Sequence, residues 1–159
     1  MSWTGTGRAR GFELGCDGPI AIMVGVDGSE QSTRALAYAV GLARRQRSRL
    51  VAVYVRSLRA SLLVVGDRTG AAVETYRQAQ DEIEAELRAL FRQSAQWGVD
   101  AVLLVADGDP FTQLSKVAEE LHADGLIIGA PSAGLRQRLA GSLAVRLVRS
   151  GRWPVTVVP

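Results

Sequence analysis

Cysteine is almost absent from this sequence of 159 residues, which excludes a fold held together by disulfides. Cys16 stands alone, so it can neither form an intrachain disulfide nor belong to a Cys-x-x-Cys metal site. Long apolar runs are absent too, and none approaches the roughly 18 to 20 residues that span a bilayer. No apolar stretch follows Arg8 and Arg10, so a secretory signal is not indicated. We therefore expect a cytoplasmic protein without membrane contact.

Lysine and histidine are equally scarce. Lys116 is the single lysine among 19 cationic residues, and the formal net charge is +3. No basic run alternates with aromatic residues, as a nucleic-acid groove requires, so no nucleic-acid partner is expected. His122 is the single histidine, and neither a Ser/His/Asp order nor a His-Glu-x-x-His motif is present. We accordingly identify no catalytic residue and no metal ligand.

The sequence does contain short apolar runs that alternate with helical patterns. Residues 1–18, with five glycines, are interpreted as a flexible leader, and residues 19–159 as one domain. Strands are predicted at 20–26, 49–55, 101–105, 126–129 and 154–158. Helices are predicted at 29–47, 71–97, 110–122 and from 139 or 142 to 150, with a long loop at 56–70.

This alternation predicts an α/β fold with a single doubly wound, parallel, five-stranded sheet. In such sheets ligands bind at the carboxyl ends of the strands, where the strand order reverses. The first strand ends at Asp27 and the fourth at Gly129. If these strands are neighbours, both residues line one crevice.

The fourth strand leads into a segment typical of an anion site. It breaks at Gly129 into a loop of small residues, and a helical pattern begins at Gly141-Ser142. Glycines let backbone N–H groups face a ligand, and a helix N-terminus adds unpaired donors. The segment from Gly129 to Ser142 is therefore predicted to hold phosphate.

Several short motifs occur in a characteristic order: Val26-Asp27-Gly28-Ser29, Gly108-Asp109-Pro110, Ala123 to Gly129, Gly141-Ser142, and Trp153 to Val158. Together they resemble the universal stress protein family over about residues 19–159. The resemblance implies an adenine nucleotide alpha hydrolase-like fold with strand order 3-2-1-4-5. It also implies a homodimer paired through the C-terminal strand Val155–Val158, and, in one branch of the family, ATP bound after strand 4.

The nucleotide-binding branch has Gly, two residues, Gly, nine residues, then Gly followed by Ser or Thr. Here Gly129 and Gly141-Ser142 match, but Ser132 replaces the second glycine and only eight residues precede Gly141. Gly134 lies two positions later and is a partial substitute. The shorter loop shifts the backbone donors relative to a bound phosphate.

The resemblance implies a set of nucleotide-binding residues: Asp27, Gly28, Val55, Gly129, Ser132, Gly141 and Ser142. Asp27 would lie at the adenine end, where its carboxylate accepts from an amine or a ribose hydroxyl. Val55 would offer backbone groups to adenine, and the residues after strand 4 would hold ribose and phosphates. The structural alternatives are that Asp27 caps the first helix, that Val55 only packs in the core and that Ser142 is a plain N-cap.

Three functions remain open. The first is a dimeric stress-response regulator that binds ATP, with Mg²⁺ as a possible companion of the phosphates and at most slow hydrolysis, since no general base is identified. The second is the same fold without nucleotide, acting as a dimeric protein-interaction module, which the shortened loop and Ser132 favour. The third is a flavin protein or enzyme on this fold, but Asp27 and Glu30 place carboxylates where a phosphate loop would be needed.

Overall fold

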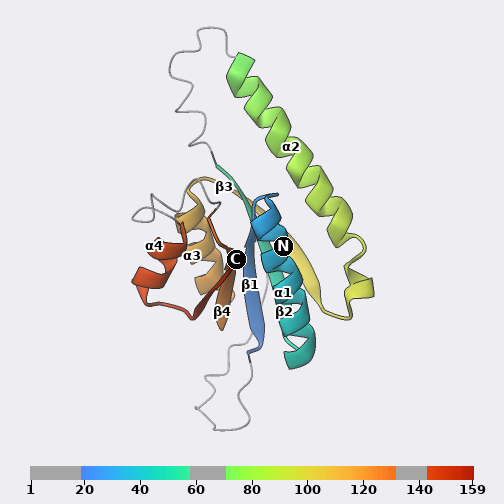
Figure 1. Cartoon of the computed structure of the whole chain (residues 1–159), viewed down its shortest axis with the longest axis vertical. Coiled ribbons are helices and arrows are strands. Elements are labelled where there is room, and N and C mark those ends of the chain that lie inside the picture. Colours follow the sequence, from blue (N-terminus) through green and yellow to red (C-terminus); the bar gives the residue numbers. More distant parts are fainter. Residues whose placement is uncertain (1–18, 58–70, 132–142) are drawn as a thin grey trace.

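The computed structural model describes residues 19–57, 71–131 and 143–159, in which strands and helices alternate (Figure 1). The strands are β1 (Ala21–Val26), β2 (Arg49–Arg56), β3 (Ala101–Asp107), β4 (Gly125–Gly129) and β5 (Val155–Val158). The helices are α1 (Glu30–Gln46), α2 (Ala71–Phe91), the 3-10 helix η2 (Ser94–Trp97), α3 (Pro110–Glu120) and α4 (Leu143–Ser150). The predicted leader lies outside the described residues, as does the predicted loop beyond Ser57.

The five strands form one parallel sheet in the order β3-β2-β1-β4-β5. This confirms the predicted α/β class and strand order. β1 lies at the centre, with Ile22 opposite Leu50 of β2 on one side and opposite Gly125 of β4 on the other. The predicted neighbourhood of the first and fourth strands is therefore correct.

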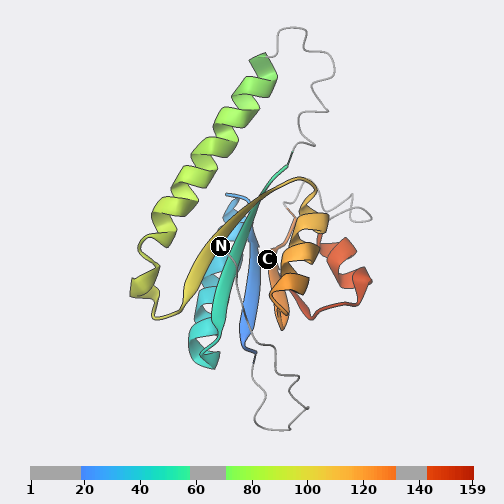
Figure 2. The same ribbon diagram turned by 180° about the vertical axis from the view of Figure 1, so that it is seen from behind.

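Helices cover both faces of the sheet. In Figures 1 and 2 the sheet lies between α1 and α2 on one side and α3 and α4 on the other. Alternate residues of β1 reach the two sides: Ile22 and Val24 belong to the core cluster under α1, while Met23 belongs to the cluster under α3 and α4. The sheet is thus doubly wound, as predicted.

α1 packs closely on the sheet because its inner face consists of small residues. Ala35, Ala39 and Ala43 are completely buried. Ser29 is the N-cap, and its side chain accepts a hydrogen bond from the Ser32 N–H. The helix ends at Gln46, and its C-cap Arg47 has a left-handed φ of 55°.

α2 is shorter than the single helix predicted for 71–97. It ends at Phe91, and residues Ser94–Trp97 form η2. The helical pattern gives way where the Gln93 N–H donates to the Leu90 carbonyl, three residues back, and the ring of Trp97 then meets that of Phe91 edge to face, with centroids 5.0 Å apart. Gly98 then ends η2 with a left-handed φ of 65°, a conformation that favours glycine.

Within the described parts of the chain, none of the helices combines the length and the apolar character needed to cross a membrane.

Candidate functional site

A pocket of about 300 Å³ opens at the carboxyl ends of β1, β2 and β4. This is the edge at which doubly wound sheets bind ligands, and β1 is the strand on whose two sides the order reverses. The described residues that line it are Gly25, Val26, Asp27, Ser29, Gln31, Ser32, Val53, Val55, Pro110, Leu114, Ile128, Gly129, Ala130, Pro131, Leu143 and Ala144. The expected crevice between Asp27 and the start of the loop after β4 is therefore present.

Asp27 lies at the mouth of this pocket, directly after β1, and its side chain is exposed. Its Oδ1 accepts from the Ser29 N–H at 3.0 Å, and its own N–H donates to Ser32 Oγ at 3.3 Å. Ser29, and not Asp27, is the N-cap of α1, so the capping alternative is not what the structure has. Within the described residues Asp27 Oδ2 has no hydrogen-bond donor, so it remains able to accept from a ligand.

A side chain at Gly28 would point toward α2 and not into the pocket. Its φ is 80°, a conformation that favours glycine, and a Cβ added there would lie 2.9 Å from Cγ2 of Ile83. Gly28 is not among the described residues that line the pocket. The structure thus explains this glycine by the turn after β1 and by the approach of α2.

Gly129 ends β4 and lines the pocket, but it also has a packing role that the sequence did not indicate. A Cβ added at this position would lie 2.6 Å from the carbonyl carbon of Gln31 and 2.8 Å from the Ser32 nitrogen. Both are backbone atoms of the first turn of α1, which cannot move aside as a flexible side chain can. Glycine here lets β4 approach the start of α1.

The remaining walls are mostly apolar. Val53 and Val55 of β2 form one wall, and Leu114 of α3 with Leu143 and Ala144 of α4 face them across the pocket. Val55 also packs against the core cluster under α3, so it serves both the core and the site. Such a lining suits a flat, weakly polar group better than a bare phosphate.

The starts of α3 and α4, which both reach the pocket, are joined by an ion pair. The Arg146 guanidinium donates to both carboxylate oxygens of Asp109, the N-cap of α3, at 3.4 Å each, and it stacks on the Phe111 ring at 4.3 Å. Partial burial acts to raise the pKa of Asp109, but hydrogen bonds from Thr112 and Arg146 outweigh it, so that this pKa is lowered.

Three residues of the predicted site, Ser132, Gly141 and Ser142, lie outside the described residues. The first described residue of α4, Leu143, lines the pocket, so the helix begins beside it. In the described ranges no group of three or more His, Cys, Asp and Glu side chains is placed to hold a metal ion.

Sequence reasoning missed part of the lining. Gln31 reaches the pocket because it lies in the first turn of α1, just after the N-cap Ser29. Asp27 and Ser29 mark this turn in the sequence, and this is the signal that could have found Gln31. Pro110 and Leu114 come from the start of α3, which Gly108-Asp109-Pro110 marks in the sequence. By contrast, no local signal pairs Arg146 with Asp109, because they are 37 residues apart.

Comparison with known proteins agrees with this fold. Residues 21–159 match the model of the universal stress protein family. The chain is 27% identical over 138 residues to universal stress protein MJ0531 of Methanocaldococcus jannaschii, covering 86% of this chain and 80% of that protein. It is 27% identical over 146 residues to universal stress protein YxiE of Bacillus subtilis, covering 86% of this chain and 97% of that protein.

A solved structure of a universal stress protein in complex with cAMP has the same fold. It aligns with a TM-score of 0.64 at 23% identity, over 89% of this chain and 97% of that one. The family match covers the whole sheet, from the first residue of β1 to beyond the last residue of β5. The chain therefore belongs to the universal stress protein family.

Proposed function

We propose that this chain is a stress-response regulator that binds ATP in the pocket between Asp27 and the start of α4, without fast catalysis. The observation that carries the proposal is the pairing of an apolar pocket with a carboxylate at its mouth, one oxygen of which has no donor within the described residues. Apolar walls suit a purine ring, and the carboxylate suits an amine or a hydroxyl on the same ligand.

The position of α4 supports the placement of the phosphates. Leu143, at its start, lines the pocket, and the N-terminus of a helix presents unpaired N–H groups and the positive end of the helix dipole. In our proposal Gly129, Ser132, Gly141 and Ser142 hold ribose and phosphates, while Asp27 and Val55 contact adenine. The relative in complex with cAMP supports an adenine nucleotide as the ligand class. Any Mg²⁺ would accompany the phosphates, since the described residues offer no metal cluster.

We also propose that the chain acts as a homodimer that pairs through β5. This strand forms one edge of the sheet, and Val157 on it is 39% exposed. The Pro154 carbonyl accepts from the Leu126 N–H and the Val158 carbonyl from the Ala130 N–H, so the backbone groups of the even-numbered residues point toward β4. In a parallel ladder the N–H groups of Val155 and Val157 then point to the free edge, where a second copy can pair.

A second function is supported by a different observation. Ser132 replaces a glycine and the following spacing is one residue short of the nucleotide-binding pattern, which favours a nucleotide-free interaction module that uses the same free edge of β5. The two functions differ in whether the purified protein binds nucleotide.

The test uses the isosteric variant Asp27→Asn. Asn keeps the acceptor for the Ser29 N–H but replaces a carboxylate oxygen with an NH₂ group, which cannot accept from the ligand. We expect ATP affinity to fall by about 10- to 100-fold, the usual weight of a hydrogen bond to a charged group. Titration calorimetry with ATP, AMP, cAMP and GTP measures it, after any bound nucleotide has been released by heating and identified by chromatography.

Asp100→Asn is the matched control, because Asp100 precedes β3 at the opposite end of the sheet and its side chain is 71% exposed. ATP affinity in this variant should equal that of the wild type. If the wild type neither carries nor binds an adenine nucleotide, the interaction module replaces the proposal. If Asp27→Asn binds ATP as tightly as the wild type, the site has been assigned wrongly.

A further inference from the structure

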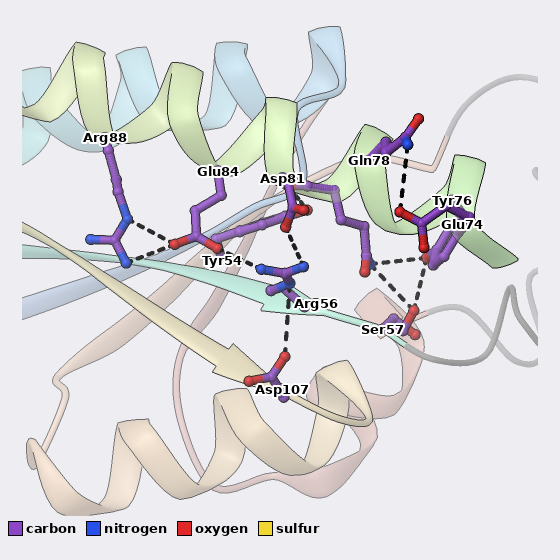
Figure 3. Close-up of polar contacts among 11 residues, drawn as sticks. Tyr54, Arg56, Ser57, Glu74, Tyr76, Gln78, Asp81, Glu84, Arg88 and Asp107 are labelled. Atoms are coloured by element: carbon purple, nitrogen blue, oxygen red, sulfur yellow. Dashed lines mark hydrogen bonds and ion pairs between the residues drawn. The ribbon is translucent and has the colours of Figure 1, made fainter.

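The carboxyl end of β2 is held from the side of the sheet that faces away from the pocket. Side chains alternate along a strand, so Val53 and Val55 line the pocket while Tyr54 and Arg56 point to α2 (Figure 3). Tyr54 is buried in the cluster under α1 and α2, and its hydroxyl donates to the backbone carbonyl of Gln80 at 3.4 Å. The wall of the pocket therefore has α2 behind it.

Arg56 makes the central contacts of this region. Its Nη2 donates to Asp81 Oδ1 at 2.5 Å and its Nη1 to Glu84 Oε2 at 3.0 Å, both on α2, while its Nε lies 3.8 Å from Asp107 Oδ1 at the end of β3. The Gly108 N–H donates to its backbone carbonyl at 2.9 Å. Side chain and backbone together thus tie one residue to two other elements.

The next residue is held as well. The Ser57 carbonyl accepts from Tyr76 Oη at 2.8 Å and from Gln80 Nε2 at 3.3 Å, and Gln80 Nε2 also lies 3.1 Å from Tyr76 Oη (Figure 3). Gln80 is only 8% exposed, so it is a buried polar residue whose amide finds its partners here. The residue before Val55 and the two residues after it are therefore all anchored to α2.

The other end of the same strand offers a direct comparison. Among the described residues Arg49, the first residue of β2, makes one ion pair, from its Nε to Asp100 Oδ2 at 3.4 Å. Isolated exposed pairs of this kind contribute little, whereas a guanidinium that joins several carboxylates has a defined geometry. The side chain of Arg56 is 26% exposed and that of its partner Glu84 is 18% exposed. The end of β2 that is held by several contacts is thus the end that borders the pocket.

We infer that Arg56 is a positioning residue of the nucleotide pocket: by anchoring the end of β2 to α2 and β3 it holds Val55 in the pocket wall. The ligand in this inference rests on the proposed function, whereas the anchoring of β2 does not depend on it. Arg56 is not among the described residues that line the pocket, so in this inference it acts on the ligand through the position of Val55.

The first experiment measures the ligand-free protein. Hydrogen exchange followed by mass spectrometry is compared among the wild type, Arg56→Met and the control Arg49→Met. We expect amides of 53–57 to exchange about tenfold faster in Arg56→Met and at the wild-type rate in Arg49→Met. Equal exchange at 53–57 in all three proteins would overturn the inference. Should Arg56→Met not fold, Asp81→Ala, which removes the acceptor of the shortest described contact of Arg56, replaces it in the same comparison.

The second experiment measures ATP affinity by calorimetry in the same proteins. Arg56→Met should bind about tenfold more weakly, because a displaced wall degrades ligand contacts, while Arg49→Met should stay within about twofold of the wild type. Arg56→Lys keeps the positive charge but lacks the planar guanidinium with its several donors, so its ATP affinity should lie between those of Arg56→Met and Arg49→Met. Equal losses in Arg56→Met and Arg49→Met would indicate a general stability effect and refute positioning. If the wild type binds no nucleotide, the proposed function fails, and the exchange experiment alone decides whether Arg56 anchors the wall.

Discussion

Substitution of Gly129 by alanine is the sharpest test of the packing between β4 and α1. Gly129 belongs to the predicted phosphate-binding segment, which suggests that its role is to approach a ligand. The structure gives it a role without any ligand, because an added Cβ would meet the backbone of Gln31 and Ser32. Gly129→Ala should therefore destabilise the protein even when no nucleotide is present.

The magnitude follows from the distances. The added Cβ would lie 2.6 Å from the Gln31 carbonyl carbon and 2.7 Å from the Gln31 carbonyl oxygen, whereas ordinary contacts between carbon atoms are about 3.5–4.0 Å. Relief requires α1 to shift as a unit, and such overpacking typically costs about 1–3 kcal/mol. For a domain of this size that corresponds to a fall in melting temperature of roughly 2–12 °C.

Urea unfolding followed by circular dichroism, without nucleotide, measures this effect. Gly41→Ala in α1 is the control, because among the described atoms a Cβ there would meet only Nη1 of Arg45, the far end of a flexible side chain, at 3.3 Å. Replacing a glycine inside a helix should stabilise the control by about 0.5–1 kcal/mol. If Gly129→Ala unfolds at the wild-type urea concentration, the close approach of β4 to α1 is not as described.

Two further outcomes follow from the ion pair and from the edge strand. Because the pKa of Asp109 is lowered in the folded protein, its ionised form contributes stability that is present above the usual aspartate pKa and lost as the pH falls through the lowered value. Asp109→Asn should thus be less stable than the wild type at pH 7 and approach it below about pH 4, in urea titrations at both pH values, and a difference independent of pH would contradict this. Val157→Pro should abolish self-association in sedimentation while the chain stays folded, whereas Thr156→Pro should lower stability, because its N–H faces β4. An intact dimer of Val157→Pro would place the interface elsewhere.

The sequence predicted the sheet well because its signals are local. Each buried parallel strand is a short apolar run, and the starts of α1 and α3 carry the capping residues Ser29 and Asp109. The predicted helix 71–97 was wrong only beyond Phe91, in residues 92–97, because the contact of Trp97 with Phe91 has no signature in the helical pattern. The helical spacing of apolar residues continues in the sequence beyond the point at which packing ends the helix.

The candidate site was predicted in part. Asp27, Val55 and Gly129 do converge on one pocket, since each lies in or next to the carboxyl end of a strand at the same edge of the sheet. The role of Gly28 in the turn facing α2 was not foreseen, because it depends on the distant Ile83. The contacts of Arg56 were missed for the same reason, since Asp81 is 25 residues away and Glu84 is 28 residues away. The roles of Ser132, Gly141 and Ser142 stay predictions.

The pocket walls are scattered along the chain, from Gly25 at the end of β1 to Ala144 in α4. The pairing of β1 with β4, which brings Asp27 and Gly129 to one pocket, closes a loop that contains α1, β2, α2, η2, β3 and α3. Contacts so distant in sequence form late and slowly during folding. During synthesis β1 and β2 are made long before β4 and α4, so the pocket can be completed only after the chain has been made beyond Ala144. Ligand binding at this site would therefore report that almost the whole domain has folded.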